Sequence, residues 1–244
     1  MMPPLLLFVP ILFLGGVFSS IAGGGLGIVT IVLGSFFLPI QQNLAITALL
    51  MFAIQVAKIF FFCGEIRWDI TLWYGLPGLP TSFIAGGLLF LLYPRLLEIV
   101  IGLLCLLFAL HPYLPFLHVK RFAFRPSRPA LVVIGAFNGV IAGIVGNGSL
   151  IRAPALLSMG LRKEEFIGTS TAVALMMNLG RNAAYAPHIV WSHELIVALI
   201  LLFPLMMFSV GIGKKLLHYV SVPMFENLQH GIMFVGAMKL LFFP

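Results

Sequence analysis

The segment from Ile141 to Pro154, IAGIVGNGSLIRAP, combines residue types that could bind an anion within an otherwise apolar stretch. Its glycines break helical structure and free backbone N–H groups, which bind oxyanions where they converge. Asn147, Gly148 and Ser149 would add small donors, and Arg152 would add a full positive charge. A cation at membrane depth costs about 3 kcal/mol on insertion scales, so Arg152 should face a cavity, an anion or a carboxylate, unless it reaches the membrane surface as an anchor.

Two further basic residues follow polar residues at helical spacing. Lys58 comes three positions after Gln55, and Arg181 comes three positions after Asn178, which places each pair on one helix face. Each basic residue could line a pathway or end a helix near the membrane surface. Their similar settings suggest that they are equivalent positions in a repeated unit.

Composition identifies the class of protein in which these residues lie. Of the 244 residues, 61% are hydrophobic and 9% are charged, and the mean hydropathy is +1.13, which is far too apolar for a water-soluble domain. Basic residues bias the cytoplasmic loops of membrane proteins, so the excess of Lys and Arg does not indicate nucleic-acid binding. We therefore predict an all-α polytopic membrane protein with a single membrane domain, 1–244. Its apolar runs, at 5–18, 44–62, 72–92 and 195–213, suit helices that cross a layer about 30 Å thick.

The two halves of the chain resemble each other. The tripeptide IAG occurs at 21–23 and again at 141–143, and the Gln55-to-Lys58 segment falls opposite Asn178 to Arg181. Each half reads as a glycine-broken segment, a helix with a polar, basic-ended stripe, and two more helices. We divide the chain into a first repeat, 1–111, a cytoplasmic linker, 112–128, and a second repeat, 129–244.

The distribution of loop charges favours inverted repeats. If each glycine-broken segment enters the membrane and returns to its own side as a re-entrant or discontinuous segment, about three full crossings remain per half and the halves have opposite orientations. Basic residues would then gather on the cytoplasmic side, as the positive-inside rule requires, with both termini outside the cytoplasm. This side would hold Arg67, Lys120, Arg121, Arg125, Arg128, Arg162, Lys163, Lys214 and Lys215, and the other side Arg95.

These motifs resemble the sulfite exporter TauE/SafE family. The resemblance rests on GGGLG in the first half, on GNGSLIRAPALLSMGL in the second half, and on the helix that opens GTSTAVALMMNLGR, and it covers essentially the whole chain. It implies a transporter of sulfite, sulfoacetate, related sulfonates or other small organic anions in the inner membrane of a prokaryotic cell. The first half departs from the family pattern, because ITALL at 46–50 replaces the expected GTS and the preceding loop, PIQQN, lacks charge.

The resulting hypothesis is an exporter that works by alternating access, with a small anion and the lipid bilayer as partners and no cofactor, metal, catalytic residue or nucleic acid. A coupling proton and the oligomeric state are left open. One alternative is a passive anion channel. Another is an intramembrane serine hydrolase that uses Ser149, although His188 and His193 lie in a predicted outer loop, away from Ser149.

The candidate substrate-binding residues come from both halves. The first half contributes two glycines of its broken segment and one basic residue, and the second half contributes its glycine-rich break and the polar positions of the helix that follows. They are Gly24, Gly25, Lys58, Asn147, Gly148, Ser149, Arg152, Thr169, Ser170, Asn178 and Arg181.

Overall fold

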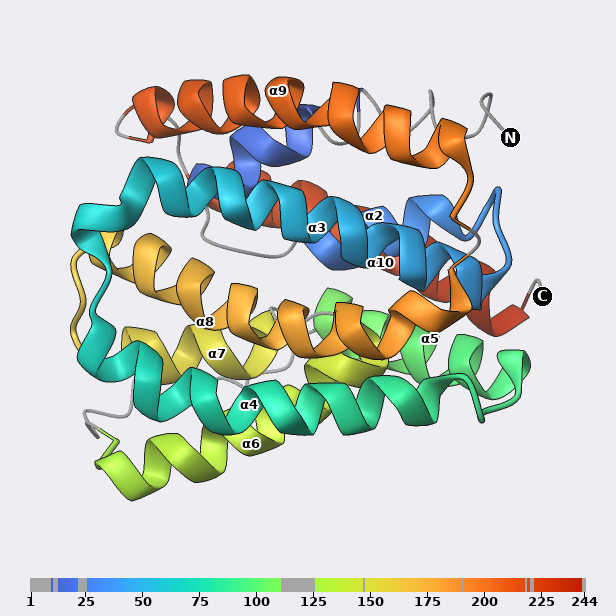
Figure 1. Ribbon diagram of the computed structural model, residues 1–244, viewed down its shortest axis with the longest axis horizontal. Helices are drawn as coiled ribbons and strands as arrows, with labels where there is room; N and C mark the ends of the chain where they lie inside the picture. Colours follow the sequence, from blue (N-terminus) through green and yellow to red (C-terminus); the bar gives the residue numbers. More distant parts are fainter. Residues whose placement is uncertain are drawn as a thin grey trace.

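The computed structural model describes residues 10, 13–21, 26–110, 126–146, 148–189, 191–217, 219 and 222–242. Throughout this part of the chain the regular secondary structure is helical, which confirms the predicted all-α class (Figure 1). A helix at 13–21 comes first. It is followed by α2 (Leu26–Gly34), α3 (Ile40–Phe62), η1 (Cys63–Glu65), α4 (Trp68–Leu89), α5 (Pro94–Leu110), α6 (Arg128–Val145), α7 (Ser149–Leu157), α8 (Lys163–Tyr185), η4 (Ala186–His188), α9 (His193–Leu216) and α10 (Val222–Phe242).

Three of the described helical segments are long and apolar enough to cross a membrane. They are Ile40–Glu65, Arg128–Val145 and Leu195–Leu216. Helix α8 is equally long but carries several polar residues, and it packs among α3, α4, α6 and α7. A helix surrounded by protein does not need an apolar face toward lipid, so its polar positions are available for a site.

Helices α4 and α6 run in the same direction and approach each other very closely. Gly135 of α6 lies against the backbone of Tyr74, and Gly143, two turns further on, lies against Ser82 of α4. Glycine lets two backbones come this close because no side chain separates them. This contact fixes the position of α6 and of the chain break that follows it.

Helix α8 runs antiparallel to α3. Near the start of α8, Gly168 lies against the Phe62 carbonyl at the end of α3. Ten residues later, Asn178 Nδ2 donates to Gln55 Oε1 at 2.6 Å. Since α4 reverses the direction of α3, helices α4, α6 and α8 all begin at one end of the bundle, on the left of Figure 1.

We name the two ends of the bundle by their residues. The Arg162 end is where α3 ends and where α4, α6 and α8 begin, and the Tyr185 end is where α3 begins and α4 and α8 end. Because α6 and α8 both begin at the Arg162 end, the chain between them enters the bundle along α6, breaks after Val145, and returns along α7 (Figure 1). Most described basic side chains of the loops and helix ends lie at the Arg162 end. They are Arg67, Arg128, Arg162, Lys163, Lys214 and Lys215.

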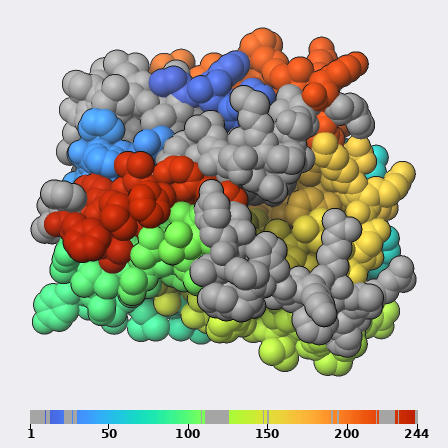
Figure 2. Space-filling model, turned by 180° about the vertical axis from the view of Figure 1, so that it is seen from behind, coloured from blue at the N-terminus to red at the C-terminus, as the bar shows by residue number. Residues whose placement is uncertain are grey.

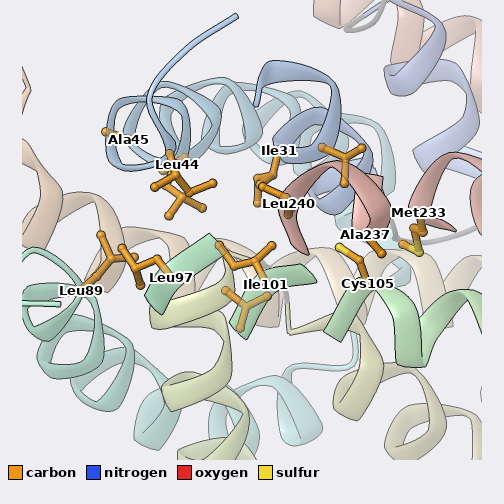
Figure 3. Packing of buried hydrophobic residues seen from close by; sticks show 14 of the residues in the cluster. Ile31, Leu44, Ala45, Leu89, Leu97, Ile101, Cys105, Met233, Ala237 and Leu240 are labelled. Atoms are coloured by element: carbon orange, nitrogen blue, oxygen red, sulfur yellow. The ribbon is translucent and has the colours of Figure 1, made fainter. Parts of the chain in front are cut away.

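The largest apolar cluster joins elements far apart in the sequence. Side chains from α2, α3, α4, α5 and α10 meet there, including Ile31, Leu44, Leu97 and Leu240 (Figure 3). Figure 2 shows α10 beside α5 on the face seen from behind, and the two helices pack together. The cluster therefore joins the last described helix to the first half of the chain.

The glycine contact between α4 and α6 makes a testable prediction for stability. A Cβ at Gly135 would lie 2.1 Å from the Tyr74 carbonyl oxygen, whereas a Cβ at Gly87 would meet nothing within 4 Å. We expect Gly135→Ala to lower the free energy of unfolding by about 1–3 kcal/mol through overpacking, and Gly87→Ala to leave it unchanged or slightly higher. Thermal melting of the purified protein in detergent measures both, and equal melting temperatures would contradict the close contact.

Candidate functional site

Two buried cations lie together between the halves of the chain. Lys58 of α3 is 2% exposed and Arg152 of α7 is 6% exposed, and they are close enough to repel each other. Lys58 Nζ donates to the backbone oxygen of Ser19 at 2.8 Å and to Ser19 Oγ at 3.2 Å. Arg152 Nε donates to Ser170 Oγ of α8 at 2.9 Å. Both side chains thus point into the bundle and not toward its surface.

Neutral polar groups complete the surroundings of these cations. Tyr74 of α4 is fully buried beside Arg152, and its hydroxyl lies near the Asn138 amide without hydrogen-bond geometry. Asn138 of α6 is also fully buried, and its Nδ2 donates to Met177 Sδ at 3.3 Å, a weak acceptor. Tyr74 Oη and Asn138 Oδ1 have no hydrogen-bond partner in the described structure. We call Ser19, Lys58, Tyr74, Asn138, Arg152 and Ser170 the central cluster.

Among the described residues, the ion pairs lie outside the central cluster. Arg67 pairs with Asp69 at 3.1 Å, and Arg162 contacts Glu65 at 3.6 Å, both at the Arg162 end. The remaining pairs, Arg95–Glu98 and Arg162–Glu165, are also at the ends of helices. No described carboxylate therefore neutralises Lys58 or Arg152.

The chain break beside the cluster is built on glycine. Gly146 ends α6 with φ 83°, in the left-handed region, and a Cβ there would also approach Arg181 Nη1 to 2.8 Å. Gly148 precedes α7 and lies against the Asn138 amide, where a Cβ would come within 2.3 Å of Oδ1. Ser149 begins α7 and is buried. The start of α7, the positive end of its helix dipole, is therefore packed against the central cluster through Asn138.

Several predicted site residues hydrogen-bond to groups outside the central cluster or lie outside the described residues. Thr169 was expected to face the glycine-rich break, but its Oγ1 accepts the Arg67 backbone N–H at 3.0 Å, at the turn before α4. Asn178 donates to Gln55, as described above. The predicted positions Gly24, Gly25 and Asn147 are outside the described residues.

Arg181 occupies a separate environment. It is 1% exposed, and its Nη1 donates to the Ala142 carbonyl near the end of α6 at 3.4 Å, a long hydrogen bond. Its guanidinium carbon lies 5.8 Å from the centre of the Tyr185 ring, whose hydroxyl donates to the Gly143 carbonyl. Arg181 Nε and Nη2 have no hydrogen-bond partner in the described structure.

The sequence analysis missed Ser19, Tyr74 and Asn138. Asn138 carried a usable signal, because an amide in an apolar run such as Leu131–Val145 is costly in a membrane unless it is buried in protein. The sequence offered less reason to predict Tyr74 as a site residue, since tyrosine is common near membrane surfaces. Ser19 contributes mainly its backbone carbonyl, which no side-chain pattern reveals.

The central cluster has the chemistry of an anion site. It presents two positive charges and a buried tyrosine hydroxyl, and these groups come from α3, α4 and α7. Charge-assisted hydrogen bonds from such donors replace the water that a small oxyanion loses on burial. Because the donors come from both halves, a relative movement of the halves would change the site.

The sequence agrees with this geometry at the level of the family. The family described as sulfite exporter TauE/SafE matches residues 8–240, which is nearly the whole chain. The chain belongs to the TauE/SafE family. Membership implies a membrane transporter of the sulfite or anion exporter type, as the sequence motifs predicted. No curated protein and no solved structure matches the chain.

TauE/SafE membership also argues against the hydrolase alternative, because the family consists of transporters and not enzymes. The structure adds a geometric argument. The His188 ring stacks on Phe90 at the Tyr185 end, with ring centres 3.8 Å apart, while Ser149 begins α7 beside Asn138. A serine nucleophile needs its histidine within hydrogen-bond reach.

The unneutralised cations predict that anions stabilise this TauE/SafE protein. Binding to the folded state alone raises the free energy of unfolding by about 2.7 kcal/mol when the ligand is at about 100 times its Kd. Sulfite should therefore raise the melting temperature at constant ionic strength, and Arg152→Gln should lose most of this effect. The exposed Lys215→Ala serves as the control. An equal sulfite effect in Arg152→Gln and wild type would place the binding outside the central cluster.

Proposed function

We propose that this protein transports small sulfur-containing anions, such as sulfite or a small sulfonate, across the membrane, and that the central cluster binds them. The observation that carries the proposal is the burial of Lys58 and Arg152 together without a described carboxylate partner. Two buried like charges repel each other through a medium of low dielectric. An anion between them removes that repulsion and gains attraction from both.

The roles within the site follow from the chemistry of each group. The Arg152 guanidinium has several N–H donors in one plane, of which Nε is used by Ser170, so the remaining edge can bind two oxygens of one anion. Lys58 supplies a second charge from the other half of the chain. Gly148 and Ser149 at the start of α7 would add backbone donors and the positive end of the helix dipole.

We further propose that the chain consists of two inverted repeats and exports its substrate by alternating access. Support comes from Gln55 and Asn178, which occupy equivalent places in the two halves and hydrogen-bond to each other across the antiparallel helices α3 and α8. Equivalent residues meet in this way where a two-fold axis passes between them. The entry and return of the chain along α6 and α7 agrees with the same arrangement.

The proposed export predicts anion flux through reconstituted liposomes. Vesicles with wild-type protein should pass sulfite and exclude cations of similar size. Arg152→Ala should reduce the flux at least about tenfold, because hydrogen bonds to a charged group are lost, and Arg152→Lys should retain part of it. The exposed Lys215→Ala should behave as wild type.

Two results of this assay would contradict the proposal. Preferential cation flux would refute the substrate class, and wild-type flux in a normally inserted Arg152→Ala protein would remove Arg152 from the site. Uphill exchange of labelled sulfite, driven by an opposing sulfite gradient, separates a carrier from a passive channel. A channel would show only downhill flux.

We also propose that the Arg162 end faces the cytoplasm of a prokaryotic cell, with both termini on the outer side of its inner membrane. The basic residues gathered at this end support that orientation through the positive-inside rule. Cys63 is exposed in η1 at the Arg162 end, whereas Cys105, the other described cysteine, is buried.

Cysteine labelling tests this orientation. A membrane-impermeant maleimide should label Cys63 in inside-out vesicles and not in intact cells. Tyr93 is 82% exposed in the native protein's α4–α5 turn, so Tyr93→Cys in a Cys63→Ala background should show the opposite pattern. Labelling of Cys63 in intact cells would reverse the proposed orientation.

A further inference from the structure

Arg181 has more hydrogen-bonding capacity than its protein surroundings use. Only Nη1 has a protein acceptor in the described structure, the Ala142 carbonyl at 3.4 Å, while Nε and Nη2 have none. A guanidinium has five N–H donors, and leaving charged donors unsatisfied in a buried site costs several kcal/mol. The Tyr185 ring offers partial compensation through its face but accepts no in-plane hydrogen bond.

Arg181 is the counterpart of Lys58. Each lies three residues after a member of the Gln55–Asn178 hydrogen bond, on antiparallel helices, so the two cations lie on opposite sides of that contact. Each also donates to a backbone carbonyl near the end of a helix that precedes a glycine-rich segment, Lys58 to Ser19 and Arg181 to Ala142. The anion-site environment of Lys58 therefore has a counterpart at Arg181.

The two environments are distinct in position and in charge. Ser170, the partner of Arg152, and Arg181 are eleven residues apart on α8, which is about 16 Å along the helix axis. Lys58 has Arg152 as a second cation nearby, whereas the described groups around the Arg181 guanidinium include the Ala142 carbonyl, the Tyr185 ring and Gly146, none of them charged. A site at Arg181 would hold an anion with one positive charge and therefore more weakly.

We propose that Arg181 forms a second, weaker binding station for the transported anion, on the Tyr185 side of the Gln55–Asn178 contact. This proposal rests on the proposed function of the central cluster. Arg181 Nε and Nη2 would bind two oxygens of a sulfite or sulfonate group in a bidentate manner. The anion would occupy the central cluster and the Arg181 station in turn as it crosses the bundle.

Matched variants separate a binding role from a structural one. Arg181→Gln removes the charge and keeps a side chain able to reach Ala142, and Arg181→Lys keeps the charge without the planar fork. Tyr185→Phe keeps the aromatic ring under Arg181 and removes only the hydroxyl that supports the Gly143 carbonyl. Arg152→Gln reports on the central cluster alone. Each variant is purified in detergent, its sulfite binding is titrated calorimetrically, and its sulfite flux is measured in liposomes.

Wild type should bind sulfite in two phases of different affinity. Arg181→Gln should lose the weaker phase and about 10- to 100-fold of the flux while it keeps the tighter phase, and Arg181→Lys should retain an intermediate flux. Arg152→Gln should lose the tighter phase and keep the weaker one. Tyr185→Phe should retain both phases.

Other outcomes would overturn the inference. A single binding phase in wild type, or wild-type flux in Arg181→Gln, would exclude a second station. A loss of flux and thermal stability in both Arg181→Gln and Tyr185→Phe would assign Arg181 to stabilising the end of α6. If wild type binds no sulfite, the proposed function itself fails, whereas a defect confined to the weaker phase leaves the central cluster intact.

Discussion

Positive charge buried in an apolar helix bundle is the constraint on which this structure depends. Lys58, Arg152 and Arg181 are each almost fully enclosed, and the ion pairs among the described residues join other groups at the helix ends. Backbone carbonyls and two serine hydroxyls satisfy only part of their hydrogen-bonding capacity. Such sites are stable enough to persist when the surrounding packing is rigid, and they favour a negatively charged ligand.

Close glycine contacts supply that rigidity. Because Gly135 and Gly143 bring α6 onto the backbone of α4, Asn138 is enclosed and the break after Val145 is held inside the bundle. Gly148 then lets the start of α7 pack against Asn138. Arg152 of α7 donates a hydrogen bond to Ser170. The position of the cationic site thus depends on the close backbone packing of α4 and α6, a contact made by uncharged residues.

In the proposed inverted-repeat arrangement, the two halves of the chain share a framework but differ in charge. Lys58 and Arg181 would hold equivalent places, and each donates to a backbone carbonyl near the end of a helix that precedes a glycine-rich segment. The second break carries Arg152, whereas the sequence has no Lys or Arg before Lys58, so the first break has no basic counterpart. A symmetric framework with unequal charge would give a transported anion one strong and one weak position.

Composition alone determined the membrane class, because apolar content on this scale cannot be reconciled with a water-soluble fold. The sequence alone also predicted the glycine-rich break and the cationic residue within it, because the effect of glycine on the backbone and the charge of arginine are properties of the residues themselves. Only the tertiary structure decided which polar groups meet. It places Lys58 within electrostatic influence of Arg152, and Tyr74 near Arg152 and Asn138. Thr169 accepts a hydrogen bond from the Arg67 backbone, and Asn178 donates one to Gln55. These partners are separated by up to 123 positions along the chain, and their meeting depends on how helices pack, which local sequence patterns do not encode.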